Sequence, residues 1–406
     1  GLGLAFRPFT FSEAIADYRL ELSLDANYVR YENDNDYEIK KPVIGLQTQI
    51  LDGVKIGATY NLDKETAFVN FSLCAANLEA GSLLHSKDND NYGIAWAQLT
   101  SLNYKPFLGY KDSYWYKMDL TGNVVTYSEP KLKIGPFSLY DTKDKSIETI
   151  INEINKAKED PNVQGILLKN PSFSTSLALQ EELIATFLDF KSTGKQVCLY
   201  YDNIGNAGYM FAAAIADKIY LNPMGSVDLR GLSISSPYIK NMLSSLGIEV
   251  LNFRSHKYKN AGNMFSEERM TDAEKEVYDS ILQSLYAQIL QRIEVGRGDK
   301  LTASPDEIIN AGPYFIATEA LDNGLVDALI YEDQLNKQMK KDFKFVKKQK
   351  ELTDYRDYAW SKPKENQIAV IYASGNIVSG KGTPGQKIAQ ETTVNLIRKA
   401  RYNNMY

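Results

Sequence analysis

The residues best suited to acid–base chemistry in this sequence are two lysines in one short segment. Residues 250–261 read Val-Leu-Asn-Phe-Arg-Ser-His-Lys-Tyr-Lys-Asn-Ala, a predicted strand that enters a loop bearing Lys257 and Lys259. A lysine serves as a general base when burial lowers its pKa from about 10.4 to near 7. The residues alone leave a second interpretation open, in which both lysines are solvated surface residues.

The sequence has few residues for histidine- or cysteine-based chemistry. The two histidines, His85 and His256, leave little room for a histidine metal site or a Ser-His-Asp triad. The two cysteines, Cys74 and Cys198, are too few for a disulfide framework or a structural zinc site. We therefore expect no metal and no cofactor. Cys198 is interpreted as a buried strand residue, and Ser226, Ser255 and His256 as residues without a catalytic role.

Composition narrows the class of protein further. The 406 residues contain 44% hydrophobic and 24% charged residues, which is ordinary for a folded chain of two or three domains. A net charge of −5 disfavours a nucleic-acid partner. The sequence has no apolar run of 18 residues that would predict a transmembrane helix.

The first 110 residues predict β-structure. Apolar residues alternate with polar ones from Tyr18 to Tyr28 and again on both sides of Asp52-Gly53, a strong hairpin signal. About six strands are predicted. Long alternating strands are typical of a segment of a membrane β-barrel, but a soluble antiparallel sheet with one buried face has the same pattern. The sequence leaves both interpretations open.

Residues 115–345 change to alternating helices and strands. Predicted helices cover 146–158, 177–191 and 207–216, and predicted strands cover 163–168, 196–201 and 218–221. Such alternation predicts parallel strands joined by crossover helices. Thr271-Asp-Ala-Glu274 is a capping box that opens a long helix, which we expect to end at Gly296.

One short pattern occurs twice. Residues 118–125 read Met-Asp-Leu-Thr-Gly-Asn-Val-Val and residues 371–378 read Ile-Tyr-Ala-Ser-Gly-Asn-Ile-Val. Each is followed by a loop and then by a predicted helix. The separation of about 250 residues predicts a tandem domain rather than a solenoid. The chain starts at Gly1 and stops inside a predicted helix, so we expect a piece of a longer protein whose second copy is cut off.

Residues from about 115 to 406 resemble the bacterial signal peptide peptidase A family, also called protease IV, in its long tandem form (peptidase family S49). Four segments carry the resemblance, and their order and spacing match through some 290 residues. They are Asn-Ala-Gly-Tyr-Met-Phe-Ala-Ala-Ala-Ile-Ala-Asp-Lys-Ile-Tyr-Leu (206–221), Asn-Pro-Met-Gly-Ser-Val-Asp-Leu-Arg-Gly (222–231), Phe-Arg-Ser-His-Lys-Tyr-Lys-Asn-Ala (253–261) and Glu-Ala-Leu-Asp-Asn-Gly-Leu-Val-Asp (319–327).

The resemblance implies a spiral α/β fold of the crotonase and Clp-protease type, here a tandem whose second copy is truncated. It also implies a serine peptidase that cleaves remnant signal peptides with a Ser–Lys dyad. The general base lies in a Tyr-Lys-Ser/Asn-Ala context in that family, which corresponds to Tyr258 to Ala261, so Lys259 is the implied base. The serine belongs to the second repeat and is expected beyond Tyr406, because the equivalent position of the first repeat is Asn206. This chain alone is therefore expected to be inactive.

The domain prediction is an antiparallel β region at 1–110, a first peptidase repeat at 111–345, and a linker with the start of a second repeat at 346–406. The resemblance implies ring-like homo-oligomers in the bacterial cell envelope, bound to a membrane and facing the periplasm. The β region replaces the family's usual anchoring helix, so the choice between inner and outer membrane stays open. Two alternative functions remain: a catalytically silent scaffold of the same fold, and a crotonase-type acyl-CoA enzyme.

Overall fold

The computed structural model describes most of the chain and separates it into two compact units. The described residues are 2–8, 20–26, 28–30, 37–51, 53–75, 77–87, 90–99, 113–128, 133–134, 137–138, 144–343, 346, 348–353, 369–383 and 387–402. One unit is Gly1–Asp112 together with Leu352–Tyr406, and the other is Ser113–Glu351. The predicted strand residue Tyr18 lies outside the described residues. The predicted domain limits stay a prediction.

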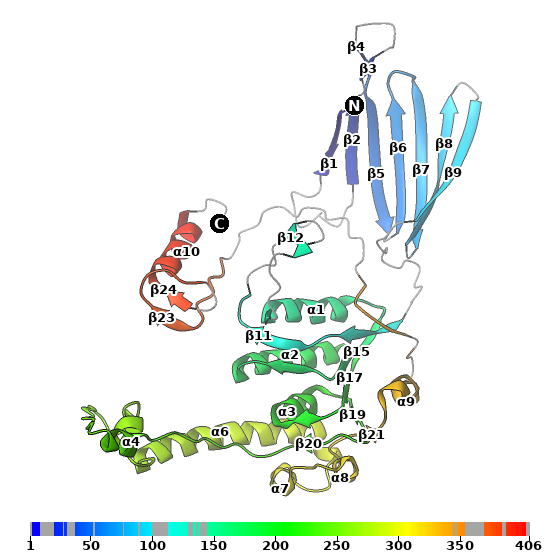
Figure 1. Ribbon diagram of the computed structural model, residues 1–406. Helices are drawn as coiled ribbons and strands as arrows, with labels where there is room; N and C mark the ends of the chain where they lie inside the picture. The colour runs from blue at the N-terminus through cyan, green and yellow to red at the C-terminus, as the bar shows by residue number, and fades with distance from the viewer. Residues whose placement is uncertain are drawn as a thin grey trace. The chain divides into compact units, whose positions relative to one another are not determined.

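The N-terminal strands form a seven-stranded antiparallel sheet, drawn in blue and cyan in Figure 1, with the order β1-β2-β5-β6-β7-β8-β9. The hairpin predicted at Asp52-Gly53 joins β5 to β6, and Gly53 adopts the left-handed φ of 81°. Its strands are β1 (Leu2–Phe6), β2 (Leu20–Ala26), β5 (Val43–Leu51), β6 (Val54–Asn61), β7 (Thr66–Ala75), β8 (Leu78–Lys87) and β9 (Asp90–Leu99). A small separate hairpin pairs β3 (Tyr28–Arg30) with β4 (Tyr37–Ile39).

This sheet places its polar and apolar side chains in an unusual way. Apolar side chains such as Val69, Phe71 and Leu84 are exposed, whereas Lys55 and Glu79 are buried and form an ion pair at 2.8 Å. The Ser72 hydroxyl donates a hydrogen bond to the same Glu79 carboxylate at 3.0 Å. Among the described residues, no helix is apolar and long enough to cross a membrane.

The second unit contains a six-stranded parallel sheet, as the alternation of helices and strands predicts. Its order is β21-β19-β17-β15-β10-β22. The inner strands are almost continuously apolar and buried, because helices cover the sheet. The strands are β10 (Tyr114–Met118), β15 (Val163–Lys169), β17 (Gln196–Tyr201), β19 (Lys218–Leu221), β21 (Ala328–Leu329) and β22 (Gln349–Lys350).

Three helices connect these strands close to the predicted bounds. They are α1 (Ile147–Glu159), α2 (Leu177–Ser192) and α3 (Asn206–Ile215). The Ser146 and Ser176 side chains cap the first two by accepting hydrogen bonds from main-chain amides of the first turn. Shorter helices come after β19 in the chain. They are α7 (Pro305–Ala311), α8 (Ala317–Asp322), α9 (Leu335–Asp342) and the 3₁₀ turns η3 (Gly298–Lys300) and η4 (Glu332–Gln334).

Short strands form a second layer beside the main sheet. A parallel three-stranded sheet has the order β14-β11-β16, with bounds Asp144–Ser146, Thr121–Val125 and Ser172–Ser174. The strand β18 (Ile204–Gly205) pairs with β20 (Val227–Asp228), and β12 (Lys133–Ile134) pairs with β13 (Phe137–Ser138). The strand β16 pairs with β11 alone among the described residues, so it is an edge strand.

A helical arm leaves this unit, drawn in yellow-green in Figure 1. It consists of α4 (Lys240–Ser245), α5 (Asn263–Ser266) and the outer part of α6 (Asp272–Arg297). Thr271 caps α6 as predicted, and the helix ends at Arg297, one residue after the predicted end at Gly296. A Cβ atom at Gly296 would lie 1.9 Å from the carbonyl oxygen of Ala213, so this glycine lets α6 pack against α3. Gly296 therefore serves close packing near the end of the helix.

The repeated sequence pattern has the same local structure in both places. Gly122 and Gly375 adopt left-handed φ angles of 86° and 90°. After the second glycine, β23 (Asn376–Val378) pairs in parallel with β24 (Lys387–Ala389), just as β11 pairs with β14. In each case the second strand leads directly into a helix, α1 or α10 (Gln390–Tyr402). The tandem domain itself stays a prediction.

Candidate functional site

Lys259 lies on the arm, in an irregular loop between α4 and α5. Its main-chain amide donates to the carbonyl oxygen of His256 at 3.1 Å, which closes a tight turn. The strand expected to begin at Val250 is absent: residues 248–254 have no regular secondary structure. Among the described residues these have no neighbouring strand to pair with, so their β-propensity produces no ladder.

A buried polar cluster fixes this loop to the start of α6. Asn263 is fully buried, and its side-chain amide donates to the Glu274 carboxylate at 3.0 Å. The Asn263 amide oxygen accepts a hydrogen bond from the Arg254 guanidinium at 3.1 Å. The Glu274 main-chain amide donates to the Thr271 hydroxyl, which is the N-cap half of the predicted capping box. The Glu274 carboxylate binds Asn263, so this residue connects the start of the helix to the lysine loop.

The two lysines of the loop differ in their contacts. Lys257 lies 3.7 Å from the Glu276 carboxylate, and its ammonium sits 4.4 Å from the centre of the Tyr258 ring. A hydrogen bond with Tyr258 and the charge of Glu276 raise the pKa of Lys257. Lys259 is exposed, and its ammonium has no hydrogen-bond or ion-pair partner within the described part of the chain. Of the two, Lys259 is thus the one available for another segment.

The lysine whose pKa burial lowers is a different one. Burial lowers the pKa of Lys195 to about 8 despite the nearby charge of Asp160. Its ammonium donates to the carbonyl oxygens of Ala157, Lys158 and Asp160 at 2.6, 2.6 and 2.7 Å. These carbonyls form the C-terminal end of α1, so Lys195 stabilises that helix end. Because its donors are occupied, it is not a candidate base.

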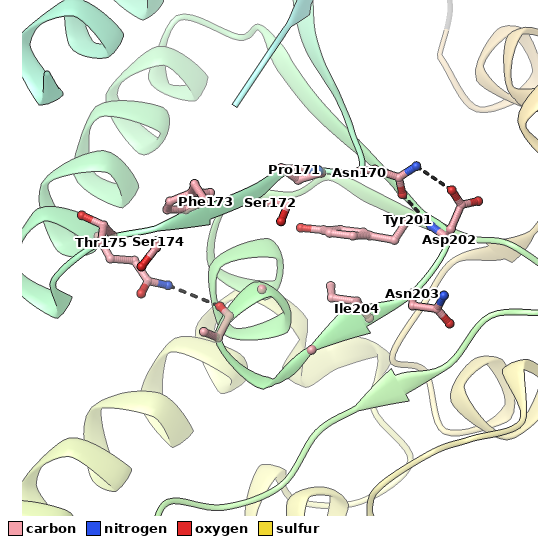
Figure 2. Close-up of a pocket in the computed structure, with 14 residues that line it drawn as sticks. Asn170, Pro171, Ser172, Phe173, Ser174, Thr175, Tyr201, Asp202, Asn203 and Ile204 are labelled. Atoms are coloured by element: carbon pink, nitrogen blue, oxygen red, sulfur yellow. Dashed lines mark hydrogen bonds between the residues drawn. The ribbon is translucent and has the colours of Figure 1, made fainter. Parts of the chain in front are cut away.

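A pocket of about 630 Å³ opens between β16 and the start of α3 (Figure 2). On one side the chain turns at Asn170, which has a left-handed φ of 44°. The Asn170 side chain donates to the Asp202 carboxylate at 2.7 Å and accepts from the Asp202 amide at 2.6 Å. This double contact joins the loops that follow β15 and β17, and so fixes the mouth of the pocket.

The start of α3 forms the opposite wall. Gly205 precedes the helix, and no side chain caps its first turn. Asn206, at the first position of the helix, has its side chain turned away: its amide oxygen accepts from the main-chain amide of Arg230 at 3.0 Å. The pocket wall at α3 is therefore made of main-chain groups and small residues, with no nucleophilic side chain at position 206.

The other sequence-selected residues lie apart from any catalytic arrangement. The Ser226 hydroxyl donates to the Asn203 amide oxygen at 3.1 Å, and exposed His256 contacts its neighbour Ser255 at 3.0 Å. Cys198 is fully buried in β17, as predicted. Within the described part of the chain, no group of three or more His, Cys, Asp or Glu residues could hold a metal ion.

Comparison with known proteins identifies this α/β domain. Residues 189–346, which include α3, the arm and the loop of Lys259, match the model of Peptidase family S49. This region of the α/β domain is related to peptidase family S49. It is 31% identical over 274 residues to Protease 4 of Salmonella typhi, and 28% identical over 273 residues to the chloroplastic serine protease SPPA of Arabidopsis thaliana. Protease 4 of Haemophilus influenzae is 28% identical over 274 residues.

These alignments cover 64%, 64% and 63% of this chain but 43%, 40% and 44% of the relatives. The chain therefore spans less than half the length of these three relatives. The match of residues 189–346 to a peptidase family favours the peptidase interpretation over the acyl-CoA enzyme. The pocket of Figure 2 was missed by sequence reasoning, although Asn170-Pro171 after a buried strand and the small residues 205–208 were available as signals.

Proposed function

We propose that this chain is part of a serine endopeptidase that hydrolyses extended, membrane-associated peptides such as remnant signal peptides. The observation that carries the proposal is the match to Peptidase family S49 together with Lys259, which is exposed at a turn of the arm and has no partner among the described residues. In the proposed dyad, Lys259 takes the proton of a serine hydroxyl while that oxygen attacks the peptide carbonyl. The serine lies beyond residue 406, in the second copy of the domain.

The exposure of Lys259 adds a requirement to this proposal. A lysine acts as a base only in its neutral form, and burial is what favours that form. The segment that carries the serine must therefore cover Lys259 when the site assembles. The cluster of Asn263, Glu274 and Arg254 holds the loop in one shape before that happens, which supports a role as a preformed half of a site.

Substitution of the two loop lysines in the full-length protein tests the base. Lys259→Ala should lower hydrolysis of a fluorogenic apolar peptide by about 10²- to 10⁴-fold, the usual contribution of a general base. Lys257→Ala is the matched control, two residues away and also exposed, and should keep normal activity. If Lys259→Ala retains activity while the protein is folded, the base assignment is wrong.

The antiparallel sheet supports the membrane part of the proposal. Its apolar side chains, among them Val69, Phe71 and Leu84, are exposed, while the ion pair of Lys55 and Glu79 is buried. Exposed apolar surface on this scale marks a contact with lipid or with another protein. We assign it to the membrane of a bacterial cell envelope, with the peptidase domain facing the periplasm. Carbonate extraction of separated inner and outer membranes tests this, and release into the soluble fraction would contradict it.

The arm supports assembly into a ring-like homo-oligomer. Several of its apolar side chains are exposed, including Leu246, Leu251 and Phe253. Such side chains become buried when copies of a chain associate. Light scattering on the full-length protein should give several protomers, and Phe253→Ser should shift the mass toward the monomer. An unchanged mass would remove the arm from the interface.

One observation favours the silent scaffold as a second candidate. Asn206 occupies the first position of α3, where the resemblance puts a serine in the catalytic repeat, and its side chain is bonded to the loop at 230–231. A full-length protein that lacks a serine at the matching place of the second copy would be a scaffold. Labelling with a fluorophosphonate probe separates the candidates, because an activated serine reacts and a scaffold does not.

A further inference from the structure

The strand β16 presents a free main-chain edge at the pocket of Figure 2. Its residues 172–174 all line that pocket. The Ser172 amide donates to the Leu120 carbonyl at 3.1 Å, so alternate residues of β16 direct their main-chain groups to β11. The amide and carbonyl of Phe173 point to the other side. The Phe173 ring packs edge-on against Phe211 of α3 at 5.0 Å, which holds this edge in place.

Hydrogen-bond donors converge on the pocket from the start of α3. Ala207 and Gly208 line the pocket in the first, uncapped turn of this ten-residue helix. The amides of a first turn have no partner inside the helix, and they carry its positive dipole end. Asn206 contributes no cap because its side chain is bonded to residues 230 and 231. These amides are therefore free to bind an oxygen of a ligand.

A buried tyrosine supplies an independent observation. Tyr201 lines the same pocket, is 3% exposed, and its hydroxyl has no hydrogen-bond partner among the described residues. In Figure 2 its ring lies between β16 and α3, with the hydroxyl pointing toward Ser172. Burial raises the pKa of Tyr201, so the hydroxyl stays protonated and can donate. A buried donor without an acceptor is costly, which indicates that an acceptor is missing.

The shape and charge of the pocket select the ligand class. A Cβ atom at Gly205 would meet nothing within 4 Å, so the space in front of the helix is open. Among the described lining residues there is no lysine, arginine or histidine, which disfavours a phosphate or another multiply charged anion. The one carboxylate among them, Asp202, is already bonded to Asn170 and Asn222 at 2.7 and 3.0 Å. The free groups are thus suited to an uncharged or singly charged carbonyl oxygen beside a strand.

We propose that this pocket binds an extended peptide as an added strand on β16, with one peptide carbonyl or carboxylate oxygen at the start of α3 and Tyr201. Strand addition gives affinity through main-chain hydrogen bonds and accepts many sequences. Because position 206 carries an asparagine, the pocket holds the peptide without cutting it. The proposal does not involve Lys259 and stands whether or not that residue is a base.

The test measures peptide binding to the full-length protein carrying Lys259→Ala and shown to be inactive, so that the probe is not consumed. The probe is a fluorescein-labelled hexapeptide of alternating alanine and leucine, used with a free C-terminal carboxylate and with an amide. Hydrogen exchange should show slower exchange at Phe173 and at residues 207–208 when either probe binds. Protection only at other segments would overturn the proposal.

Variants of the pocket provide the second measurement. Gly205→Leu fills the open space and should weaken binding at least about 10-fold, and Gly231→Leu is the matched control. A Cβ atom at Gly231 also meets nothing within 4 Å, and Gly231 is not among the pocket-lining residues, so binding should be unchanged. Tyr201→Phe should weaken binding about 5- to 10-fold, the loss of one hydrogen bond. Its melting temperature should not fall, because the hydroxyl has no partner in the free protein.

The two probes locate the oxygen that is bound. Equal affinity for the acid and the amide assigns an internal peptide carbonyl, and tighter binding of the acid assigns the terminal carboxylate. Unchanged binding to Gly205→Leu would show that the peptide lies elsewhere. Residual hydrolysis by Lys259→Ala would count against the proposed base alone, and the binding test would then use protein inactivated with the fluorophosphonate probe.

Discussion

The two large sheets of this chain distribute polar and apolar side chains in opposite ways. In the parallel sheet, the strands β15, β17 and β19 bury apolar side chains under covering helices. In the antiparallel sheet, a row of apolar side chains is exposed and a lysine–glutamate pair is buried. Sheets therefore cannot be assigned an inner face from alternation alone, because the alternation is the same when the apolar face points outward.

The largest expected difference between the sheets comes from removing one phenylalanine from each. Phe187 of α2 is fully buried over the parallel sheet, and Phe187→Ala should lower the free energy of unfolding by about 4 kcal/mol. Phe71 of β7 is 40% exposed, and Phe71→Ala in detergent should cost less than about 1 kcal/mol. Urea unfolding followed by hydrogen exchange reports on each sheet separately. Equal costs would mean that the apolar face of the antiparallel sheet is covered in solution.

A smaller effect is expected from the buried ion pair. Lys55→Met leaves Glu79 buried without its nearest cation and should destabilise the antiparallel sheet by about 3 kcal/mol. The double variant with Glu79→Leu should recover most of that loss, because apolar pairs often replace buried ion pairs without cost. Urea unfolding followed by hydrogen exchange measures the stability of both variants. If Lys55→Met does not destabilise the sheet, water reaches Glu79 on this face.

The smallest effect concerns acid stability of the parallel sheet. Burial alone would raise the pKa of Asp327, but the Arg297 guanidinium at 2.6 Å, the Ile219 amide and Lys300 outweigh it, and the pKa is lowered. A lowered pKa in the folded state stabilises the protein above the unfolded value of about 3.9, and this stabilisation is lost as pH falls below it. Asp327→Asn should therefore flatten the decline in stability of this sheet below about pH 4. A decline as steep as in the unsubstituted protein would contradict the assignment.

The sequence predicted regular elements well where local chemistry decides them. The helix α1 begins after the serine cap at 146 and ends before Asp160-Pro161, within one residue of the predicted bounds. The hairpin at Gly53 was predicted because glycine readily adopts the left-handed φ that such a turn needs, and Gly53 does so. In contrast, the strand predicted at Val250 failed because its formation depends on a neighbour. The packing role of Gly296 was not predicted, because it depends on α3, an element distant in sequence.

The candidate site was predictable only in part. The resemblance selected Lys259, and residues 253–261 lie inside the matched family region, but its role as a base stays a prediction. Lys257 has an ion-pair partner and Lys259 has none among the described residues. That partner is Glu276 of α6, so the difference depends on the packing of α6 beside the loop. The pocket is lined by β16, by Tyr201 at the end of β17 and by the start of α3. Nothing in the spacing of these segments along the sequence predicts that they lie together. Such contacts are decided by tertiary structure.

The helix α6 acts mechanically as a lever. Its 26 residues span about 39 Å, with Gly296 packed on α3 at one end and the Asn263–Glu274 contact carrying the Lys259 loop at the other. A rotation of about 5° at the packed end would move the loop by about 3 Å, a whole hydrogen-bond length. The position of Lys259 is therefore sensitive to the packing of Gly296 on α3, far from the lysine itself.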